Sequence, residues 1–323
     1  MSTVTLALDR YDRHLPLLLG AVTAPDGYVV DVLEVGQHGA LRHGEHRHER
    51  MLRDREFSAA EVSLSSFLIA SDQGVPVTGI PVFPRRLFSQ TQMFVNADSG
   101  ISTPKDIEGR RVGLQSFQTT LALLAKGDLK FVYDVDLTSV DWRLKHAETL
   151  SVDVKGFSIS QMLAGKSPGE LLAAGEIDAL LYSRTPEGMA EAGGKIRRLF
   201  DDPRAETQRV FAADGFWPIM HVIAVRTELA DADPNLCSML MALWDSSLKE
   251  SRRWYQDPNC LQFPWARLDV EYQLAAFDVE LWPSGVSANR ACLERFVKYS
   301  CDQGLISRAL DVDALFHQTV RAT

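Results

Sequence analysis

Two arginines directly follow an apolar segment that has the composition of a strand. Residues 75–83 are predicted to form this strand, and Arg85 and Arg86 come just after it. A guanidinium pairs with a carboxylate in bidentate geometry, and ligands of open α/β sheets bind beyond the carboxyl ends of the strands. We therefore expect at least one of the two arginines to bind an anionic ligand. The alternative is that both are solvated side chains.

A histidine stands where the chain enters another apolar segment. His221 precedes residues 222–225, and its imidazole titrates in the range that suits proton transfer near neutral pH. Two carboxylates could act with it: Asp12, which follows the first predicted strand, and Glu61, which could donate a proton if burial raised its pKa. We predict that His221 and one of these carboxylates handle a proton. The alternatives are a structural histidine and an aspartate that caps a helix.

Hydroxyl groups gather at a predicted strand-to-helix turn. Ser63, Ser65 and Ser66 could bind phenol or carboxylate oxygens, and the phenol of Tyr11 could do the same. The serines could equally satisfy buried backbone groups. Because no histidine–aspartate pair stands beside them at the spacing of a known motif, a serine hydrolase is a poor explanation of this cluster.

A second turn is predicted to begin a helix. Ser116 is expected to cap a helix over about 117–126, and Gly127 is expected to end it. The backbone N–H groups at a helix start attract anions. Besides simple capping, we therefore expect ligand contacts from Ser116 and from the next polar residues, which are Gln118, Thr119 and Thr120.

Two aromatic side chains could enclose a flat ligand. Phe83 ends the predicted strand before the arginines, and Trp217 lies just before His221. An aromatic ring stacked between them would be held by its faces. Both residues could instead belong to the core.

Histidines also crowd one segment near the N-terminus, which raises the question of a metal site. They are His38, His43, His46 and His48, and they are accompanied by Glu45 and Glu49. The spacing is not that of a standard metal site, and the surrounding residues are rich in Gly and Arg. We therefore favour a solvated loop and expect no metal.

The composition is that of an ordinary globular protein. The chain has 323 residues, 46% of them hydrophobic and 24% charged, with a net charge of −9. The negative charge and the lack of a basic stripe argue against a nucleic-acid partner. No apolar run is long enough to span a membrane. The first residues lack the features of a secretory leader, so we expect a cytoplasmic protein.

Strands and helices alternate along most of the chain, which predicts an α/β protein with two lobes. We expect lobe I to comprise residues 1–93 and 222–323, and lobe II to comprise 94–221, with strands near 93 and 221 joining them. Long amphipathic helices follow residue 234 and belong, in this prediction, to lobe I. They could also pack on another subunit, which leaves a homo-oligomer open.

Several sequence strings occur together in a characteristic order. They include Glu56-Phe57-Ser58, Ile80-Pro81-Val82-Phe83-Pro84 with Arg86, Trp217-Pro218-Ile219-Met220-His221 and Trp282-Pro283-Ser284-Gly285. In this order the chain resembles the 4,5-dihydroxyphthalate decarboxylases. The resemblance implies a two-lobed fold like that of type 2 periplasmic binding proteins, with a ligand between the lobes. It also implies an enzyme that needs no cofactor, and it favours Arg86 over Arg85 because the family keeps this arginine.

The chain departs from the family in two places. Ser89-Gln90 stands where the family usually has an Arg-His pair, and Gln115-Ser116-Phe117 replaces a loop of Pro-Glu-Tyr character. A lost cation and imidazole near a ligand would change how an anion is held. The sequence therefore does not identify the substrate.

These observations together predict decarboxylation of a hydroxylated aromatic carboxylate. Arg86 and the helix start would hold carboxylates, and His221 with Asp12 or Glu61 would protonate the ring carbon that loses CO2. One alternative is a receptor on the same scaffold that binds a small aromatic or carboxylate ligand without changing it. Another is an enzyme of this scaffold with a different substrate.

Overall fold

The chain folds into two compact units. The computed structural model describes residues 2–37, 41–189, 194–277 and 279–323. Unit 1 comprises Met1–Arg86, His221–Leu293 and Leu310–Thr323, and unit 2 comprises Leu87–Met220 and Glu294–Ala309. The sequence placed residues 294–309 with the first lobe, whereas the structure groups them with unit 2.

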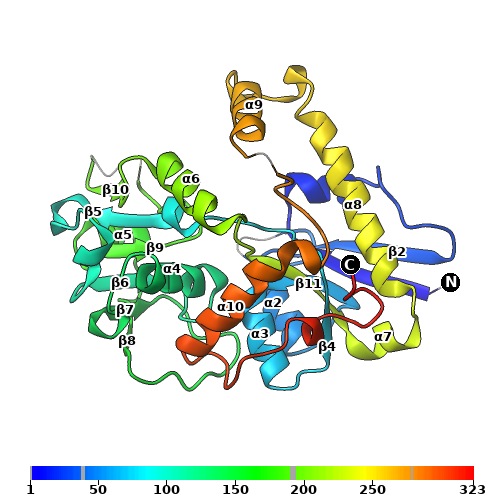
Figure 1. The fold of residues 1–323 in the computed structure, drawn as a ribbon, viewed down its shortest axis with the longest axis horizontal. Coiled ribbons are helices and arrows are strands. Elements are labelled where there is room, and N and C mark those ends of the chain that lie inside the picture. Colours follow the sequence, from blue (N-terminus) through cyan, green and yellow to red (C-terminus); the bar gives the residue numbers. More distant parts are fainter. Residues whose placement is uncertain (1, 38–40, 190–193, 278) are drawn as a thin grey trace. The chain divides into compact units, whose positions relative to one another are not determined.

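The core of unit 1 is a five-stranded mixed sheet (Figure 1). Its order is β2 (Tyr28–Glu34), β1 (Ser2–Leu8), β3 (Ala59–Ser63), β11 (His221–Arg226) and β4 (Val77–Ile80). Strand β1 runs parallel to β2 and β3, whereas β11 runs antiparallel to β3 and β4. The ends of β1, β3 and β4 therefore lie at the same edge of the sheet as the start of β11.

Helices pack against this sheet. They are α1 (Leu15–Leu18), α2 (Arg47–Leu52), α3 (Leu64–Asp72), α7 (Thr227–Ala232) and α8 (Leu236–Trp254). Unit 1 also contains α9 (Ala266–Ala276) and the start of α10 (Arg290–Asp302). Helix α8 has its apolar residues on one side, and Leu240 and Trp244 are buried in one cluster with Leu6 and Val225 of the strands. The amphipathic pattern of α8 is thus explained by its packing on the sheet.

Unit 2 has a six-stranded mixed sheet. Its order is β10 (Ile196–Arg198), β5 (Met93–Asn96), β9 (Ala179–Leu181), β6 (Arg111–Leu114), β7 (Asp141–Leu144) and β8 (Ser158–Gln161). Strands β9, β6, β7 and β8 are parallel, and β5 is antiparallel to both of its neighbours. The helices of this unit are α4 (Thr120–Phe131), α5 (Pro168–Ala173), α6 (Pro203–Asp214) and the end of α10.

Helix α4 differs from the prediction at both ends. It is capped by Thr119 rather than Ser116, and it continues through Gly127 to Phe131. A Cβ atom on residue 127 would lie 1.9 Å from Cδ2 of Tyr299, so the glycine lets the Tyr299 ring approach the helix backbone. This glycine therefore serves close packing and not the end of a helix. The same contact helps to explain why residues 294–309 pack in unit 2.

Helix α9 is the most exposed part of unit 1. None of its residues is buried, and large apolar side chains of the helix and its flanks are exposed, among them Phe263, Trp265, Leu268 and Leu274. No helix of the described residues is long and apolar enough to cross a membrane. The homo-oligomer stays a prediction from the sequence.

Candidate functional site

The carboxyl edge of the unit 1 sheet brings several predicted site residues together. His221 begins β11 and lies opposite Ser63, which ends β3. Asp9 directly follows β1, and its backbone N–H donates to Oε2 of Glu61 at 3.3 Å. The backbone carbonyl of Arg85 accepts a hydrogen bond from the His221 N–H at 3.3 Å. Parallel and antiparallel pairing thus collects residues from four distant segments.

Glu61 lies at the centre of this group with no exposed surface. One carboxylate oxygen, Oε1, bonds Nδ1 of His221, and the other, Oε2, lies 3.2 Å from Nη2 of Arg47. Burial would raise the pKa of Glu61, but the charge of Arg47 and the contact with His221 hold it well below its usual range. These contacts hold Glu61 as a carboxylate, and its role as a proton donor stays a prediction from the sequence.

Arg47 compensates the buried charge of Glu61. It is the first residue of α2 and is itself fully buried. Its Nε donates to the backbone oxygen of Glu61 at 2.7 Å, and its Nη1 lies 3.3 Å from Oδ2 of Asp9. Arg47 was not predicted from the sequence because it lies in the segment that we expected to be a solvated loop. The buried Met51 and Leu52 further along α2 are the apolar signal that could have indicated a packed helix there.

His221 is a neutral imidazole held in one orientation. Burial lowers its pKa to about 4, although the charge of Glu61 and the hydrogen bond to it act in the opposite direction. Because Glu61 is ionised, Nδ1 of His221 carries the proton and donates it to the carboxylate. The other ring nitrogen, Nε2, is then an acceptor that can take up a proton and return it.

A second imidazole lies against His221. The rings of His48 and His221 are 5.1 Å apart between centroids and nearly perpendicular. Burial and the nearby charge of Arg47 hold the pKa of His48 well below its usual range. Among the residues that the structure describes, none forms a hydrogen bond with Nε2 of His48. His46, the residue just before α2, has a φ of 63°, a left-handed conformation that is uncommon outside glycine.

The described histidines of this segment are His43, His46 and His48. Within the described ranges, no group of three or more His, Cys, Asp or Glu side chains is placed to hold a metal ion. Nδ1 of His43 accepts a hydrogen bond from the Glu34 N–H at 2.9 Å. His38 lies outside the described residues.

Tyr11 and His14 form the next layer around Glu61. Burial raises the pKa of Tyr11, and the charge of Glu61 raises it further, so the phenol stays protonated and can donate a hydrogen bond. The ring of His14 lies 5.1 Å from that of Tyr11, and its Nδ1 contacts the backbone oxygen of Asp9 at 2.8 Å. Burial lowers the pKa of His14 to about 4. The cluster is therefore rich in neutral polar groups.

The two predicted arginines have different surroundings. The backbone of Arg85 is hydrogen-bonded to that of His221, and besides the larger effect of burial the charge of Arg85 lowers the pKa of both His48 and His221. Arg86 is buried, and its Nη2 donates to Oδ1 of Asn289 at 2.6 Å and to the backbone oxygen of Pro283 at 3.2 Å. The structure thus brings Arg85 to the cluster. A ligand contact from Arg86 stays a prediction.

The contacts of Arg86 involve the Trp-Pro-Ser-Gly string near the end of the chain. Asn289 also donates from Nδ2 to the backbone oxygens of Pro283 and Gly285, at 2.9 and 2.7 Å. Gly285 has a φ of 97°, which a residue with a side chain rarely adopts. The Trp-Pro-Ser-Gly string and Asn289 therefore form a loop that is tied to Arg86.

Asp12 is placed differently from Glu61. Its carboxylate accepts hydrogen bonds from the Tyr255 hydroxyl and from the Arg13 backbone and side chain. Burial would raise its pKa, but these hydrogen bonds and the Arg13 charge lower it. In the part of the chain that the structure describes, the Asp12 carboxylate forms no hydrogen bond with Glu61 or His221, and a catalytic role for Asp12 stays a prediction.

The serines stand at the start of α3. Ser63 caps this helix by accepting a hydrogen bond from the Ser66 N–H at 3.4 Å, and Ser65 is fully buried. Ser63 lies beside His221 through the strand pairing. Capping is thus shown for Ser63, and ligand contacts from the three serines stay predictions.

The predicted anion site at the start of α4 holds a carboxylate of the protein itself. The N–H groups of Phe117 and Gln118 donate to Oε1 and Oε2 of Glu148, at 2.7 and 3.0 Å. The Gln118 side chain donates to the backbone oxygen of Leu150 at 2.7 Å. The backbone groups bind an anion as predicted for a helix start, but this anion is part of the chain. Ser116 and Thr120 are buried nearby.

The two predicted aromatic residues belong to different units. In unit 1, Phe83 is buried and its ring meets that of Phe316 edge to face, with 6.2 Å between centroids. In unit 2, Trp217 stacks on Phe88 at 6.3 Å. Each therefore contributes to the packing of its own unit. Their joint contact with a ligand ring stays a prediction.

The residues that depart from the family pattern surround a buried carboxylate in unit 2. Oδ2 of Asp128 accepts hydrogen bonds from Ser89 at 2.5 Å and Gln90 at 3.3 Å, and Oδ1 accepts one from the Tyr299 hydroxyl at 3.2 Å. Burial raises the pKa of Asp128 to about 6, although the Ser89 hydrogen bond opposes this. Ser89 and Gln90, which replace the Arg-His pair of the family, thus belong to a hydrogen-bonded group inside unit 2.

Comparison with known proteins agrees with the resemblance in the sequence. The chain is 28% identical to 4,5-dihydroxyphthalate decarboxylase of Comamonas testosteroni over 324 residues, which cover 97% of this chain and 96% of that relative. The enzyme of the same name from Pseudomonas putida is 28% identical over 214 residues, covering 62% of this chain and 78% of the relative. The chain is similar to 4,5-dihydroxyphthalate decarboxylases. The predicted resemblance to this enzyme family is confirmed.

The fold is that of periplasmic binding proteins. The chain matches the crystal structure of the periplasmic aliphatic sulphonate binding protein SsuA of Escherichia coli with a TM-score of 0.62, over the whole of both chains and at 12% identity. Residues 55–141 match a family model described as NMT1/THI5 like. The predicted fold class is therefore confirmed. At 12% identity the match to the binding protein supports the fold and not a function.

We expect the two units to respond oppositely to mild acid. In unit 1, His14 and His221 have pKa values of about 4, below the unfolded value of roughly 6.5. Unfolding therefore takes up protons as the pH falls from about 6.5 to 4, and each histidine lowers stability by up to about 1.4 kcal/mol per pH unit. In unit 2, Asp128 has a raised pKa, so its folded form binds the proton first and gains stability below pH 6.

Amide hydrogen exchange measured against pH checks this expectation. After correction for the intrinsic exchange rate, protection in β3 should decrease from pH 6.5 to 4.5, whereas protection in β6 should not. The variant His14→Gln should flatten the decrease in β3. A parallel loss of protection in both sheets would contradict the assignment of these pKa values.

We expect Glu148→Gln to destabilise unit 2 by about 1–3 kcal/mol, because two backbone N–H groups lose a charged acceptor. Urea unfolding measures the change, and Glu176→Gln is a matched control on an exposed residue. A Glu148→Gln variant with unchanged stability and tighter binding of phthalate would show instead that the carboxylate occupies a ligand position.

Proposed function

We propose that this protein is a cofactor-independent decarboxylase that acts on a hydroxylated aromatic carboxylate similar to 4,5-dihydroxyphthalate. The observation that carries the proposal is the buried pair of Glu61 and His221, with Arg47 behind it and Arg85 beside it. Strongly shifted pKa values in one cluster of facing side chains are typical of a catalytic site. The similarity to two decarboxylases, one of them over 97% of this chain, supports the same proposed activity.

The charges of the cluster suit an anionic substrate. The positive charge of Arg47 is matched by Glu61 and Asp9, to which it is bound. Arg85 adds a further positive charge near the two imidazoles, which are themselves neutral. A substrate carboxylate placed beside Arg85 would gain a bidentate partner. Arg85 is thus the group that we assign to the carboxylate.

The Glu61–His221 pair supplies the proton. When an anionic substrate binds, its charge raises the pKa of His221, and Nε2 takes up a proton while Nδ1 remains bound to Glu61. The imidazolium then transfers this proton to the ring carbon that carries the departing carboxylate. The bond between the ring and the carboxyl carbon breaks, its electron pair returns to the ring, and CO2 leaves. The imidazole is reprotonated from water for the next turnover.

The neighbouring neutral groups assist this step. A ring hydroxyl para to the departing carboxylate donates electron density, and a hydrogen-bond partner at that hydroxyl strengthens the effect. Tyr11, Ser63 and the imidazole of His48 are the polar groups of the cluster suited to contact ring hydroxyls. Because Glu61 and His221 are both buried, the proton transfer occurs away from bulk water, where electrostatic interactions are stronger.

Two alternatives differ from this proposal in what happens to the ligand. A solute-binding receptor has the same fold, but the fold alone does not decide function. A receptor can hold an anion without a buried Glu–His pair, whereas proton transfer uses such a pair. The pair therefore favours an enzyme. A decarboxylase of a related substrate is the second alternative. The cytoplasmic location and the homo-oligomer remain predictions from the sequence.

The experiment that tests the proposal measures CO2 release from a panel of hydroxybenzoates and hydroxyphthalates. We expect turnover with at least one ortho-dihydroxylated member. His221→Asn should lower kcat by about 10²–10⁴-fold, because general acid catalysis contributes that much. His146→Asn, which changes an exposed histidine of unit 2, is the matched control and should leave kcat unchanged.

Binding of phthalate, measured by calorimetry, separates catalysis from recognition. The His221→Asn variant should keep an affinity close to that of the wild type, whereas Arg85→Gln should weaken binding. Recovery of every tight-binding ligand unchanged would favour the receptor. Unchanged kcat in His221→Asn would overturn the assignment of the proton donor.

A further inference from the structure

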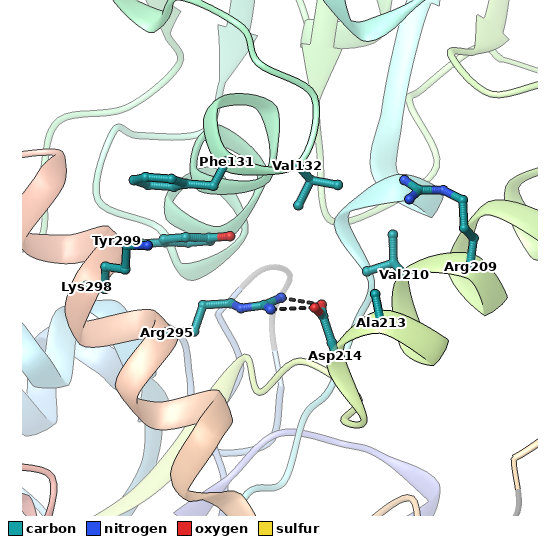
Figure 2. A pocket seen from close by; sticks show the side chains of 9 residues that line it. All are labelled: Phe131, Val132, Arg209, Val210, Ala213, Asp214, Arg295, Lys298 and Tyr299. Atoms are coloured by element: carbon teal, nitrogen blue, oxygen red, sulfur yellow. Dashed lines mark hydrogen bonds and ion pairs between the residues drawn. The ribbon is translucent and has the colours of Figure 1, made fainter.

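Unit 2 contains a cavity that the proposed reaction does not use. It lies between the end of α4, the end of α6 and the part of α10 that belongs to this unit (Figure 2). Its volume is about 470 Å³, within the range of small-molecule sites. All of its lining residues belong to unit 2, whereas the Glu61–His221 cluster belongs to unit 1.

One side of the cavity is aromatic and apolar. The ring of Phe131 stacks on that of Tyr299, with 5.2 Å between centroids and an angle of 7° between the planes. Phe131 is partly exposed even though Tyr299 beneath it is buried. Val132 and Val210 project into the cavity from α4's end and from α6 (Figure 2). These side chains offer a surface on which a flat apolar group can lie.

Of the charged residues that line the cavity, Lys298 is the one that forms no ion pair among the described residues. Arg295 pairs through both terminal nitrogens with Asp214, as the dashed lines in Figure 2 show. Arg209 pairs with Glu206 outside the cavity at 2.6 Å. Lys298 lies 4.3 Å from the Phe131 ring centroid, and among the described residues no carboxylate lies within ion-pair distance of it. A protein with a net charge of −9 thus presents an uncompensated cation beside an apolar surface.

The surroundings favour a ligand with a single negative charge. Phe131 and Asp214 are the last residues of α4 and α6 and both line the cavity, so the carboxyl ends of two helices lie beside it. The partial negative charge of a helix end disfavours a dianion such as phosphate. One ammonium group can still pair with one carboxylate, and the Phe131 surface favours an aromatic body over a purely polar one.

We propose that this cavity binds a small aromatic monocarboxylate, with the ring against Phe131 and Val210 and the carboxylate at Lys298. The site is separate from the Glu61–His221 cluster and needs no residue of it. The monocarboxylate that remains when a dicarboxylate loses CO2 belongs to this class, a link that rests on the proposed function. The binding itself does not depend on whether the protein is a decarboxylase.

Titration of the full-length protein with 4-fluorobenzoate, followed by NMR of labelled valine methyl groups, tests the proposal. We expect the methyl signals of Val132 and Val210 to shift in a saturable way, with a millimolar or lower Kd. The uncharged 4-fluorobenzamide and the dianion phthalate should shift them less. If only the methyl groups of Val62 and Val222 shift, the ligand binds at the unit 1 sheet, which overturns this site and leaves the proposed function intact.

Variants of the lining residues complete the test. Lys298→Glu should weaken binding by at least about tenfold, because the cation at the carboxylate is replaced by a like charge. Lys249→Glu makes the same change on an exposed residue of α8 in unit 1, and it should leave binding unchanged. Ala213→Trp should fill the cavity and abolish the methyl shifts. Equal affinity in the wild type and Lys298→Glu, or no saturable shift of Val132 and Val210, would overturn the proposal.

Discussion

The arrangement of unit 1 depends on keeping an ionised carboxylate away from water. A charge as deeply buried as that of Glu61 is tolerated only when it is paired and hydrogen-bonded. Arg47, His221 and the Asp9 N–H supply these partners. Removing one partner of such a group leaves an uncompensated buried charge, which makes the fold and the chemistry of this edge interdependent.

This constraint explains why distant segments meet at one edge of the sheet. Helix α2 brings Arg47, strand β3 brings Glu61, and strand β11 brings His221. The parallel pairing of β1 with β3 and the antiparallel pairing of β3 with β11 fix the order in which they meet. A scaffold also found in solute-binding proteins thereby holds the His221 imidazole against a buried carboxylate, an arrangement that the proposed proton transfer requires.

The same contacts show what the sequence could and could not predict. Apolar segments predicted the strands, and the sequence singled out both Glu61 and His221, which the structure brings into contact. Their role in a site stays a prediction. Arg47 was not predicted because its main partner, Glu61, lies 14 residues away in another element. No local sequence pattern reveals such a contact. Gly127 was taken as a helix end because a glycine's packing partner, here Tyr299, cannot be seen in the sequence.

The arginines and the helix start show a second limit of local patterns. Arg85 and Arg86 are adjacent, and only the structure distinguishes the one near the imidazoles from the one bound to Asn289. The start of α4 was recognised as an anion site, but nothing local indicated that Glu148 would bind there. The position of a ligand between two lobes remains a prediction from the family resemblance.

The central claim is that Glu61 is ionised and holds His221 as the neutral tautomer with its proton on Nδ1. Nitrogen-15 NMR of the imidazole, recorded from neutral pH down to about pH 4 on ligand-free protein, measures this directly. The account predicts a neutral ring protonated at Nδ1 at pH 7, with a pKa of about 4. A ring that is already an imidazolium at pH 7, or that carries its proton on Nε2, would contradict it.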